Sequence, residues 1–205
     1  MKWGFPFGPS PSSPSSSSAT ASICINTRDD SLIGTGKPTF RESRSKHRCI
    51  VLISGFFEWQ HDGKTKIPFF ISSNQGGLLF LAGLFTTRRG ELACTIVTRS
   101  SIGSEISSIH DRMPVFVNDE QCRDLWMGKS VWTEDVEKIL HLLPLSSYLS
   151  LQRVSNHVNR VQNNDERCIQ PQFSDEETAS NTKPRQKKIT SFFPYLSRRK
   201  HNKDA

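Results

Sequence analysis

The sequence contains no pair of closely spaced cysteines. Its five cysteines, an odd number in 205 residues, are spread from Cys24 to Cys168 without any C-x-x-C spacing. This pattern excludes a disulfide framework and does not fit a structural zinc site. Cys49 and Cys94 fall inside apolar runs, so we expect them to be buried and unreactive. The sequence therefore predicts a reducing compartment, nuclear or cytosolic, and no metal or other cofactor.

Long apolar runs are also missing. No segment is long and apolar enough to cross a bilayer, and Met1-Lys2-Trp3 leads into Pro and Ser rather than a signal-peptide core. Apolar residues make up 35% of the chain and are scarcest at its two ends. Residues 10–22 are almost all Ser, Pro, Ala and Thr, which predicts a mobile surface loop, and residues 173–205 predict a disordered tail. We therefore expect one domain over residues 1–172.

The excess of positive charge is small on the domain and larger on the tail. The formal net charge is +7; residues 1–172 hold 19 Lys and Arg against 16 Asp and Glu, and residues 173–205 hold 8 against 4. A basic chain indicates a nucleic-acid partner. The small excess on the domain argues against wrapping of a duplex and favours a few placed arginines. We expect a monomer.

Short apolar runs separated by turn residues predict a sheet. An Asp62-Gly63 pair predicts a tight hairpin turn, and Pro68 suggests that the returning strand is an edge or carries a bulge. Helices are expected near residues 37–46, 118–126 and 133–143, the last capped by Thr133. The fold class is therefore α+β, a curved, antiparallel-rich β-sheet with a few peripheral helices. The predicted strands are residues 23–28, 48–55, 67–71, 78–85, 92–98 and 149–154.

Glu58 stands among aromatic residues after an apolar, β-branched run. The run from Arg48 predicts a buried strand that ends at Gly55. A carboxyl group at a strand end beside Phe57 and Trp59 would be partly desolvated, which raises its pKa toward the range useful for proton transfer. Glu58 is therefore a candidate general acid or base.

A second motif, Ser-Ile-His-Asp-Arg-Met-Pro at residues 108–114, carries an imidazole and a guanidinium two residues apart. If this segment is extended, His110 and Arg112 face the same side. Such a pair suits acid/base chemistry on an anionic substrate. Taken alone, the motif is more often an exposed turn before a proline.

Asn26 and Arg28 also lie two residues apart, on the strand-like segment that follows the Ser/Pro-rich loop. The period of two along a strand gives them a common face. The alternative is a strand end followed by a turn, because Asn and Asp commonly start turns.

These elements occur together, in this order, in a known family. Gly-Phe-Phe-Glu-Trp at residues 55–59 is followed about 50 residues later by Ile-His-Asp-Arg-Met-Pro, and Trp3-Gly4-Phe5 and Asn26-Thr27-Arg28 match two further elements. In these motifs the chain resembles the SRAP family, the abasic-site processing proteins also called SOS-response-associated peptidases. The resemblance extends from Met1 to about Pro171.

The resemblance implies a reaction with single-stranded DNA that carries an abasic site. An N-terminal cysteine of the family forms a Schiff base with the sugar aldehyde and closes a thiazolidine, because a 1,2-aminothiol offers an amine and a thiol to one carbon. Carried over to this chain, Asn26 would orient the cysteine and Glu58 would shuttle the proton that opens the sugar ring. His110 would assist imine formation and its reversal.

The resemblance also implies DNA-binding residues. Arg28 and Arg112 would hold the phosphates that flank the lesion, a role suited to the forked guanidinium group. Trp3 and Trp59 would support the site or stack on bases, with core packing as the alternative for both.

The sequence departs from the family at its start. Lys2 follows Met1, and no Cys-Gly-Arg element precedes the tryptophan motif, so we expect an N-terminally truncated family member. Cys24 lies near a predicted catalytic residue but has no free α-amine. Two hypotheses follow: an enzyme that shields abasic sites by cross-linking to them during replication-coupled repair, or a non-covalent single-strand-binding remnant. A cysteine protease ranks below both, because no Cys–His pair with a supporting third group can be assigned.

The tail contains a second recognisable motif. Residues 186–193 (Gln-Lys-Lys-Ile-Thr-Ser-Phe-Phe) match Q-x-x-(I/L/M)-x-x-F-F, with which disordered segments dock on the sliding clamp PCNA. One helical turn places Ile189, Phe192 and Phe193 on one side as an apolar plug, beside which Gln186 hydrogen-bonds. The alternative is a chance set of apolar residues in a basic tail. Residues 198–200 (Arg-Arg-Lys) suit nuclear import, and we expect a nuclear protein.

We predict that a peptide of residues 183–200 binds PCNA without the folded domain. Replacing Phe192 and Phe193 together by alanine should abolish binding measured by calorimetry, because each buried anchor contributes about 2 kcal/mol or more. The double variant Thr190→Ala, Ser191→Ala, between the anchors, is the control and should bind normally. Equal affinity of the phenylalanine variant would contradict the prediction.

Overall fold

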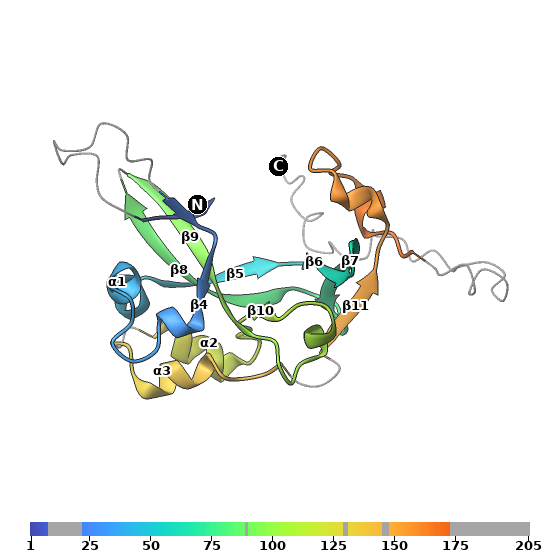
Figure 1. The fold of residues 1–205 in the computed structure, drawn as a ribbon. Helices are drawn as coiled ribbons and strands as arrows, with labels where there is room; N and C mark the ends of the chain where they lie inside the picture. The colour runs from blue at the N-terminus through green and yellow to red at the C-terminus, as the bar shows by residue number, and fades with distance from the viewer. Residues whose placement is uncertain (8–21, 89, 129–130, 145–147, 173–205) are drawn as a thin grey trace, which may run out of the picture.

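The computed structural model describes residues 1–7, 22–88, 90–128, 131–144 and 148–172 (Figure 1). Within these ranges no helix is long and apolar enough to cross a membrane. The strands are β1 (Lys2–Trp3), β2 (Phe5–Phe7), β3 (Ser22–Cys24), β4 (Asn26–Arg28), β5 (Arg48–Ile53), β6 (Gly55–Asp62), β7 (Thr65–Ser73), β8 (Leu79–Arg88), β9 (Glu91–Ser100), β10 (Arg112–Pro114) and β11 (Leu149–Arg153). The helices are α1 (Pro38–Lys46), α2 (Glu120–Met127) and α3 (Glu134–Ile139), with 3-10 turns η1 (Asp29–Ser31), η2 (Glu105–Ser108), η3 (Asn156–Asn159) and η4 (Glu166–Ile169).

Strand β9 is the centre of the larger sheet. It pairs with β8 and β10 in the antiparallel sense and with β1 and β4 in the parallel sense, and β5 extends the sheet beyond β8. The sheet curls, and α2 and α3 lie together below it in Figure 1. The predicted fold class, an α+β fold with a curved, antiparallel-rich sheet and few helices, is confirmed.

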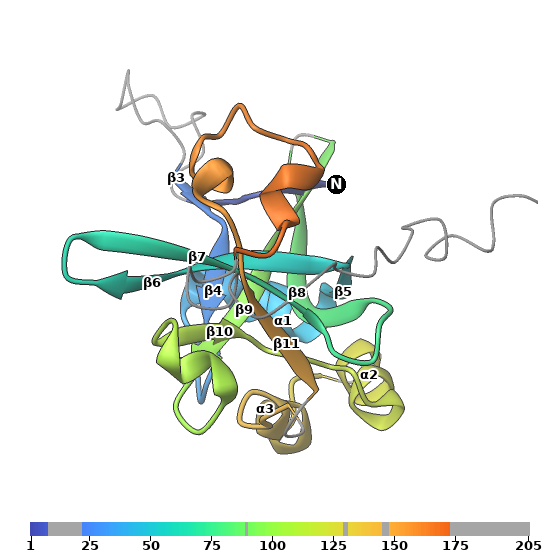
Figure 2. The same cartoon turned by 90° about the vertical axis from the view of Figure 1, so that its right-hand side faces the viewer.

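A smaller sheet is built on the β6–β7 hairpin, with β11 on the other side of β7. Asp62 pairs with Thr65 across the turn, and Gly63 takes a left-handed φ of 57° that glycine adopts at no steric cost. The Asp-Gly signal therefore predicted this turn. The hairpin projects away from the larger sheet in Figure 2.

The predicted strand at residues 23–28 is interrupted at Ile25, which separates β3 from β4. The predicted strand at residues 48–55 is also broken, although the sequence gave no reason to break it. β5 ends at Ile53, Ser54 interrupts the ladder, and β6 begins at Gly55. A Cβ atom on Gly55 would lie 2.7 Å from the carbonyl oxygen of Ile71, so only glycine allows this close crossing. Glu58 is consequently in the middle of β6, and the expectation that it ends a strand is wrong.

The expectation that Pro68 marks an edge strand or a bulge is also wrong. Pro68 lies on β7, the middle strand of the smaller sheet, and not on an edge strand or a bulge. Its carbonyl accepts a hydrogen bond from the Val154 N–H at 3.0 Å, just past the last ladder pair between β7 and β11. The missing proline N–H is therefore lost only at the end of the ladder, where it costs little.

Two cores lie on opposite faces of the sheet. Neighbouring residues are divided between them: Ala82 and Val115 pack in one core, whereas Leu81 and Phe116 pack in the other. This division is the period of two expected for a strand whose two faces are both covered. The helix-side core is completed by Phe5, Leu32, Phe40, Leu84, Val97, Val117, Trp126, Val136, Ile139 and Leu140.

The predicted cap of α3 is present, because the Thr133 hydroxyl accepts from Val136 N–H. Pro38 opens α1, close to its predicted start. α2 begins two residues later than predicted, and the Asp119 carboxylate accepts from Cys122 N–H to cap it. α3 ends at Ile139, earlier than predicted. The buried Arg48 donates to the carbonyls at the end of α2, satisfying acceptors that a helix end leaves unpaired.

Candidate functional site

A cleft of about 640 Å³ lies where the two sheets meet. Side chains from β4, β6, β9 and β10 and from the loop before β10 line it. Six of the seven residues that the sequence singles out for catalysis or DNA binding are among them: Trp3, Asn26, Arg28, Glu58, His110 and Arg112. The seventh, Trp59, is not. Segments more than 80 residues apart in the chain thus contribute to one surface.

Asn26 and Arg28 reach the cleft because β4 runs parallel to β9. Asn26 pairs with Ile96 and Arg28 with Thr98, while the intervening Thr27 is buried. The predicted common face is therefore present. Within the described residues the Asn26 side-chain amide makes no hydrogen bond, which leaves it available to a ligand.

Both arginines of the cleft are already paired with aspartates. Arg28 Nη2 lies 2.7 Å from Asp30 Oδ2 on an exposed surface, and this contact raises the pKa of Arg28. Arg112 Nη2 lies 2.8 Å from Asp29 Oδ1 and 2.6 Å from the Thr98 carbonyl, with both side chains largely buried. Sequence reasoning took the two aspartates only as turn residues and missed this pairing.

The contacts of His110 hold its ring in place through Nδ1. This nitrogen lies 3.0 Å from the Arg112 backbone nitrogen, 3.1 Å from the Arg112 carbonyl oxygen and 3.2 Å from Asp111 Oδ1. Nε2 makes no hydrogen bond to the described residues. The loop itself is held by Ser101, whose hydroxyl donates to the His110 carbonyl at 2.5 Å. His110 thus offers the cleft a free Nε2 on a fixed ring.

Gln60 connects the two motifs. Its side-chain amide on β6 donates to the Ser108 carbonyl at 2.8 Å, two residues before His110. Because Gln60 and Glu58 are two apart on one strand, this bond fixes the loop of His110 relative to the carboxylate. The sequence did not single out Gln60.

Glu58 is partly buried on β6, close to His110 and to aromatic rings. Burial raises the pKa of Glu58 above its ordinary value, while the His110 charge and the Trp59 backbone N–H oppose the rise and Asp111 adds to it. Desolvation is the largest of these effects, and it is the one that the sequence predicts. The environment therefore favours a carboxyl group that can hold and release a proton.

The two tryptophans have different surroundings. Trp3 is 60% exposed beside the cleft, and its indole N–H donates to the Ile25 carbonyl at 2.8 Å. The Trp59 indole N–H donates to Asn159 Oδ1 at 2.7 Å, which directs the ring toward η3. The ring of Trp3 is therefore accessible at the cleft, whereas that of Trp59 does not line it. DNA contact by either tryptophan stays a prediction.

The cysteine that lines the cleft is Cys94 on β9. It is 8% exposed, and burial raises the pKa of its thiol, so the nucleophilic thiolate is disfavoured. Burial likewise raises the pKa of Cys49 to about 12. Cys24, half-buried outside the cleft, donates its thiol hydrogen to the Asn26 carbonyl at 2.8 Å.

No cluster of three metal-ligating side chains lies in the cleft, as far as the described residues show. The acid/base groups, the free amide and the arginines can instead hold an anionic ligand and transfer protons to it.

Comparison with known proteins identifies the family of the chain. The family described as "SOS response associated peptidase (SRAP)" matches residues 1–161. The chain belongs to the SRAP family. The abasic site processing protein YMR114C of Saccharomyces cerevisiae is 36% identical over 131 residues, which cover 62% of this chain and 36% of that protein. The abasic site processing protein YoqW of Bacillus subtilis is 33% identical over 152 residues, which cover 71% of this chain and 66% of that protein.

Solved structures share the SRAP fold of this chain. A crystal structure of a protein from Bacteroides thetaiotaomicron matches with a TM-score of 0.59 at 23% identity, over 77% of this chain and 79% of that one. At this identity the match supports the fold alone. The curated SRAP relatives also extend beyond the matched region, since the chain spans about a third of the yeast protein and about two thirds of YoqW.

We predict that Glu58→Gln stabilises the protein at neutral pH. Because burial raises the pKa of Glu58, the folded state binds this proton more tightly than the unfolded chain does. That contribution to stability is fully present below the ordinary pKa of glutamate and is lost as pH rises through the raised pKa. The melting temperature of the variant should therefore exceed that of the wild type at pH 7 and equal it near pH 4.

Glu42→Gln, on the exposed surface of α1, is the matched control. Its melting temperature should differ little from that of the wild type at either pH, since exposed ion pairs contribute about 0–1 kcal/mol. A Glu58→Gln protein that is less stable than the wild type at pH 7 would show that burial of the Glu58 carboxylate does not destabilise the folded state.

Proposed function

We propose that the cleft binds single-stranded DNA at an abasic site and that its proton-transfer groups open the sugar and promote imine formation. The observation that carries the proposal is the convergence of Glu58, His110 and Asn26 with two arginines in one cleft. Membership of the SRAP family supports it, because both relatives described above are named as abasic site processing proteins.

Glu58 supplies the proton for ring opening. An abasic sugar is mainly a closed hemiacetal, and opening requires one proton on the ring oxygen and removal of another from the hydroxyl. The raised pKa of Glu58 favours the carboxylic acid that gives the first proton as the C–O bond breaks. The resulting carboxylate then receives the hydroxyl proton, directly or through water, so Glu58 is restored and the aldehyde is formed.

His110 acts on the next step. An amine adds to the aldehyde carbon, and the carbinolamine must lose its hydroxyl as water to become an imine. A protonated His110 gives the Nε2 proton to that hydroxyl and returns to the neutral ring, while Nδ1–H stays on the Arg112 carbonyl and Asp111 Oδ1. In the reverse direction the same nitrogen accepts a proton from the attacking water, so His110 serves both imine formation and hydrolysis.

A thiazolidine cross-link needs more than these residues. The thiol must add to the imine carbon while its proton passes to the nitrogen, so the amine and the thiol must belong to one N-terminal cysteine. Cys94, the thiol in the described part of the cleft, has no α-amine and a raised pKa, so it does not supply this pair. The described residues therefore account for the imine chemistry, and the cross-link would need an N-terminal cysteine in addition.

Non-covalent binding of single-stranded DNA is the second candidate. It is favoured by Arg28, which is exposed at the mouth of the cleft, and by the exposed ring of Trp3. A guanidinium and an aromatic face are the two groups that hold a single strand without reading its sequence. This function needs no nucleophile.

The proposed PCNA-binding residues, 186–193, lie outside the described residues. We propose that this motif tethers the domain to replicating DNA in the nucleus, a role that rests on the sequence motif alone.

We predict that the 205-residue chain forms only a borohydride-dependent adduct with abasic DNA. Without a 1,2-aminothiol the product is a reversible imine, which survives denaturing electrophoresis only after reduction. Uracil-containing single-stranded DNA treated with a glycosylase is the substrate. Glu58→Gln should lower the rate of trapping by roughly 100-fold or more, the usual contribution of general acid catalysis.

Glu134→Gln, an exposed change in the first turn of α3, is the control and should trap at the wild-type rate. A heat-stable protein–DNA adduct that forms without borohydride would contradict the prediction that the product is only an imine. Binding without any trapped band would favour the non-covalent function instead.

We also predict that Arg28→Ala weakens binding to single-stranded DNA and reduces its salt dependence. Loss of one phosphate contact should lower the slope of log K against log salt by about 0.7 for a single strand. The measurement is fluorescence anisotropy at several salt concentrations. Arg153→Ala, at the exposed end of β11, should leave the slope unchanged. Tighter binding to undamaged duplex than to single strands would contradict the assignment of the cleft.

A further inference from the structure

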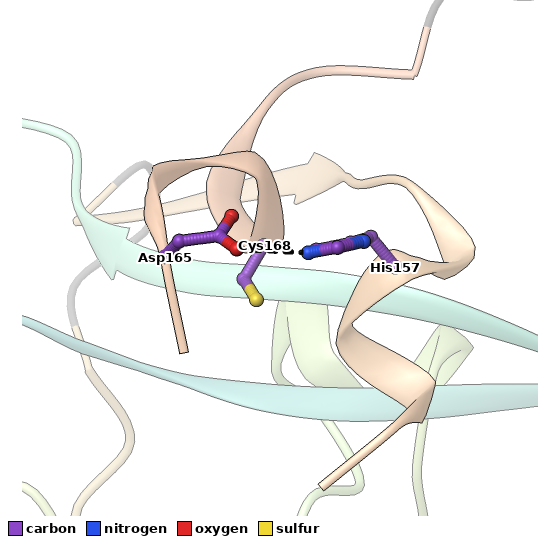
Figure 3. A group of neighbouring side chains, drawn as sticks. All are labelled: His157, Asp165 and Cys168. Atoms are coloured by element: carbon purple, nitrogen blue, oxygen red, sulfur yellow. Dashed lines mark hydrogen bonds and ion pairs between the residues drawn. The ribbon is translucent and has the colours of Figure 1, made fainter. Parts of the chain in front are cut away.

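The segment that follows β11 brings three metal-ligating side chains together. His157 belongs to η3, Asp165 precedes η4, and Cys168 belongs to η4. One potential ligand atom from each lies within 4.8 Å of the other two (Figure 3). The cluster was not expected from the sequence, because paired cysteines are the usual sign of a zinc site and this chain has none.

We propose that His157 Nε2, an Asp165 carboxylate oxygen and Cys168 Sγ bind a zinc ion, with water in the fourth position. A thiolate and an imidazole select zinc over the hard cations Mg²⁺ and Ca²⁺, which prefer oxygen ligands. Zinc bonds of about 2.0–2.3 Å place tetrahedral ligand atoms about 3.3–3.7 Å apart. The 3.1 Å between His157 Nε2 and Asp165 Oδ2 is close to this range. Cys168 Sγ, which lies 3.6 Å from the Asn163 carbonyl, would have to leave that contact to bind the metal.

The charges and the exposure of the cluster suit a divalent ion. One carboxylate and one thiolate neutralise Zn²⁺, and the imidazole adds no charge. The Arg167 guanidinium contacts both oxygens of the Asp165 carboxylate, with Nε 3.0 Å from Oδ1 and Nη2 2.8 Å from Oδ2, so the metal would share this carboxylate with a cation. Cys168 is buried, whereas the side chains of His157 and Asp165 are 23% and 40% exposed, so the open position faces solvent.

Metal binding would redistribute two protons. Asn163 Nδ2 lies 2.6 Å from the His157 carbonyl and 3.1 Å from Nδ1, so without metal Nδ1 accepts and Nε2–H donates to Asp165. A metal on Nε2 moves the imidazole proton to Nδ1, where a rotated Asn163 amide accepts it through Oδ1. The Cys168 thiol releases its proton to solvent. Asn163 is thus a positioning residue for the imidazole.

The metal site would also stabilise one wall of the cleft, through η3. η3 carries Asn159, which accepts the hydrogen bond from Trp59 on β6, and Trp59 is adjacent to Glu58. A metal that joins η3 to η4 would fix this contact and so the strand that presents the carboxylate. This inference does not depend on the proposed function, because it concerns metal binding alone.

The test uses cobalt as a spectroscopic probe of the full chain, reduced and freed of metal with a chelator. One equivalent of Co²⁺ should produce the ligand-to-metal absorption of a cobalt thiolate, and Zn²⁺ should remove it by competition. Cys168→Ser should lose this absorption. Cys122→Ser, a half-buried cysteine on α2, is the matched control and should retain it.

Two further variants guard against a folding defect in the serine variant. His157→Gln should lose the one-equivalent binding, and Asn163→Leu should weaken the Zn²⁺ affinity by about 10–100-fold, as loss of an outer partner does. Zn²⁺ should raise the melting temperature of the wild type and of Cys122→Ser, but not of Cys168→Ser. A wild type without thiolate absorption at one equivalent of Co²⁺, or a Cys168→Ser variant that keeps it, would overturn the proposal.

Discussion

The hydrogen-bond ladder of β9 is the constraint on which the cleft depends. This single strand pairs with β4 through Asn26 and Arg28 and with β10 through Arg112. Segments 84 residues apart along the chain are therefore fixed within one ladder. The buried hydrogen bond between the Thr27 and Thr95 hydroxyls, 3.1 Å long, holds β4 against β9 from the opposite face. Any shift of β4 by one residue would exchange the buried and cleft-facing side chains.

Local signals in the sequence predicted the local structure well. The Asp62-Gly63 turn, the helix cap at Thr133, and the common face of Asn26 and Arg28 all depend on residues close in sequence. Short-range geometry decides such features, so propensity and periodicity are sufficient. The expectation that these site residues share one cleft depended instead on the family resemblance, because no local pattern indicates which strands meet.

Features that depend on distant contacts were not predictable from local patterns. The need for glycine at position 55 is set by Phe70 and the carbonyl of Ile71 on the neighbouring strand. The direction of Trp59 is set by Asn159, 100 residues away, and the position of Cys94 in the cleft by how the two sheets meet. One face of β9 packs in a core and the other lines the cleft, and both carry apolar residues. The apolar run in the sequence therefore does not indicate which of the cysteines in such runs lines the cleft.

The two arginine–aspartate pairs give the cleft different electrostatic responses to a phosphate. Arg28 is exposed, so water and salt screen its attraction to Asp30, and a phosphate can replace that carboxylate at little cost. Arg112 and Asp29 are largely buried, so removing the guanidinium from Asp29 would leave a charge unpaired in a poorly solvated place. Arg112 therefore keeps its partner, although its buried Nε makes no hydrogen bond to the described residues. On this argument Arg28 is the arginine that a phosphate could recruit with a strong dependence on salt, whereas Arg112 mainly ties β10 to Asp29 and to the Thr98 carbonyl.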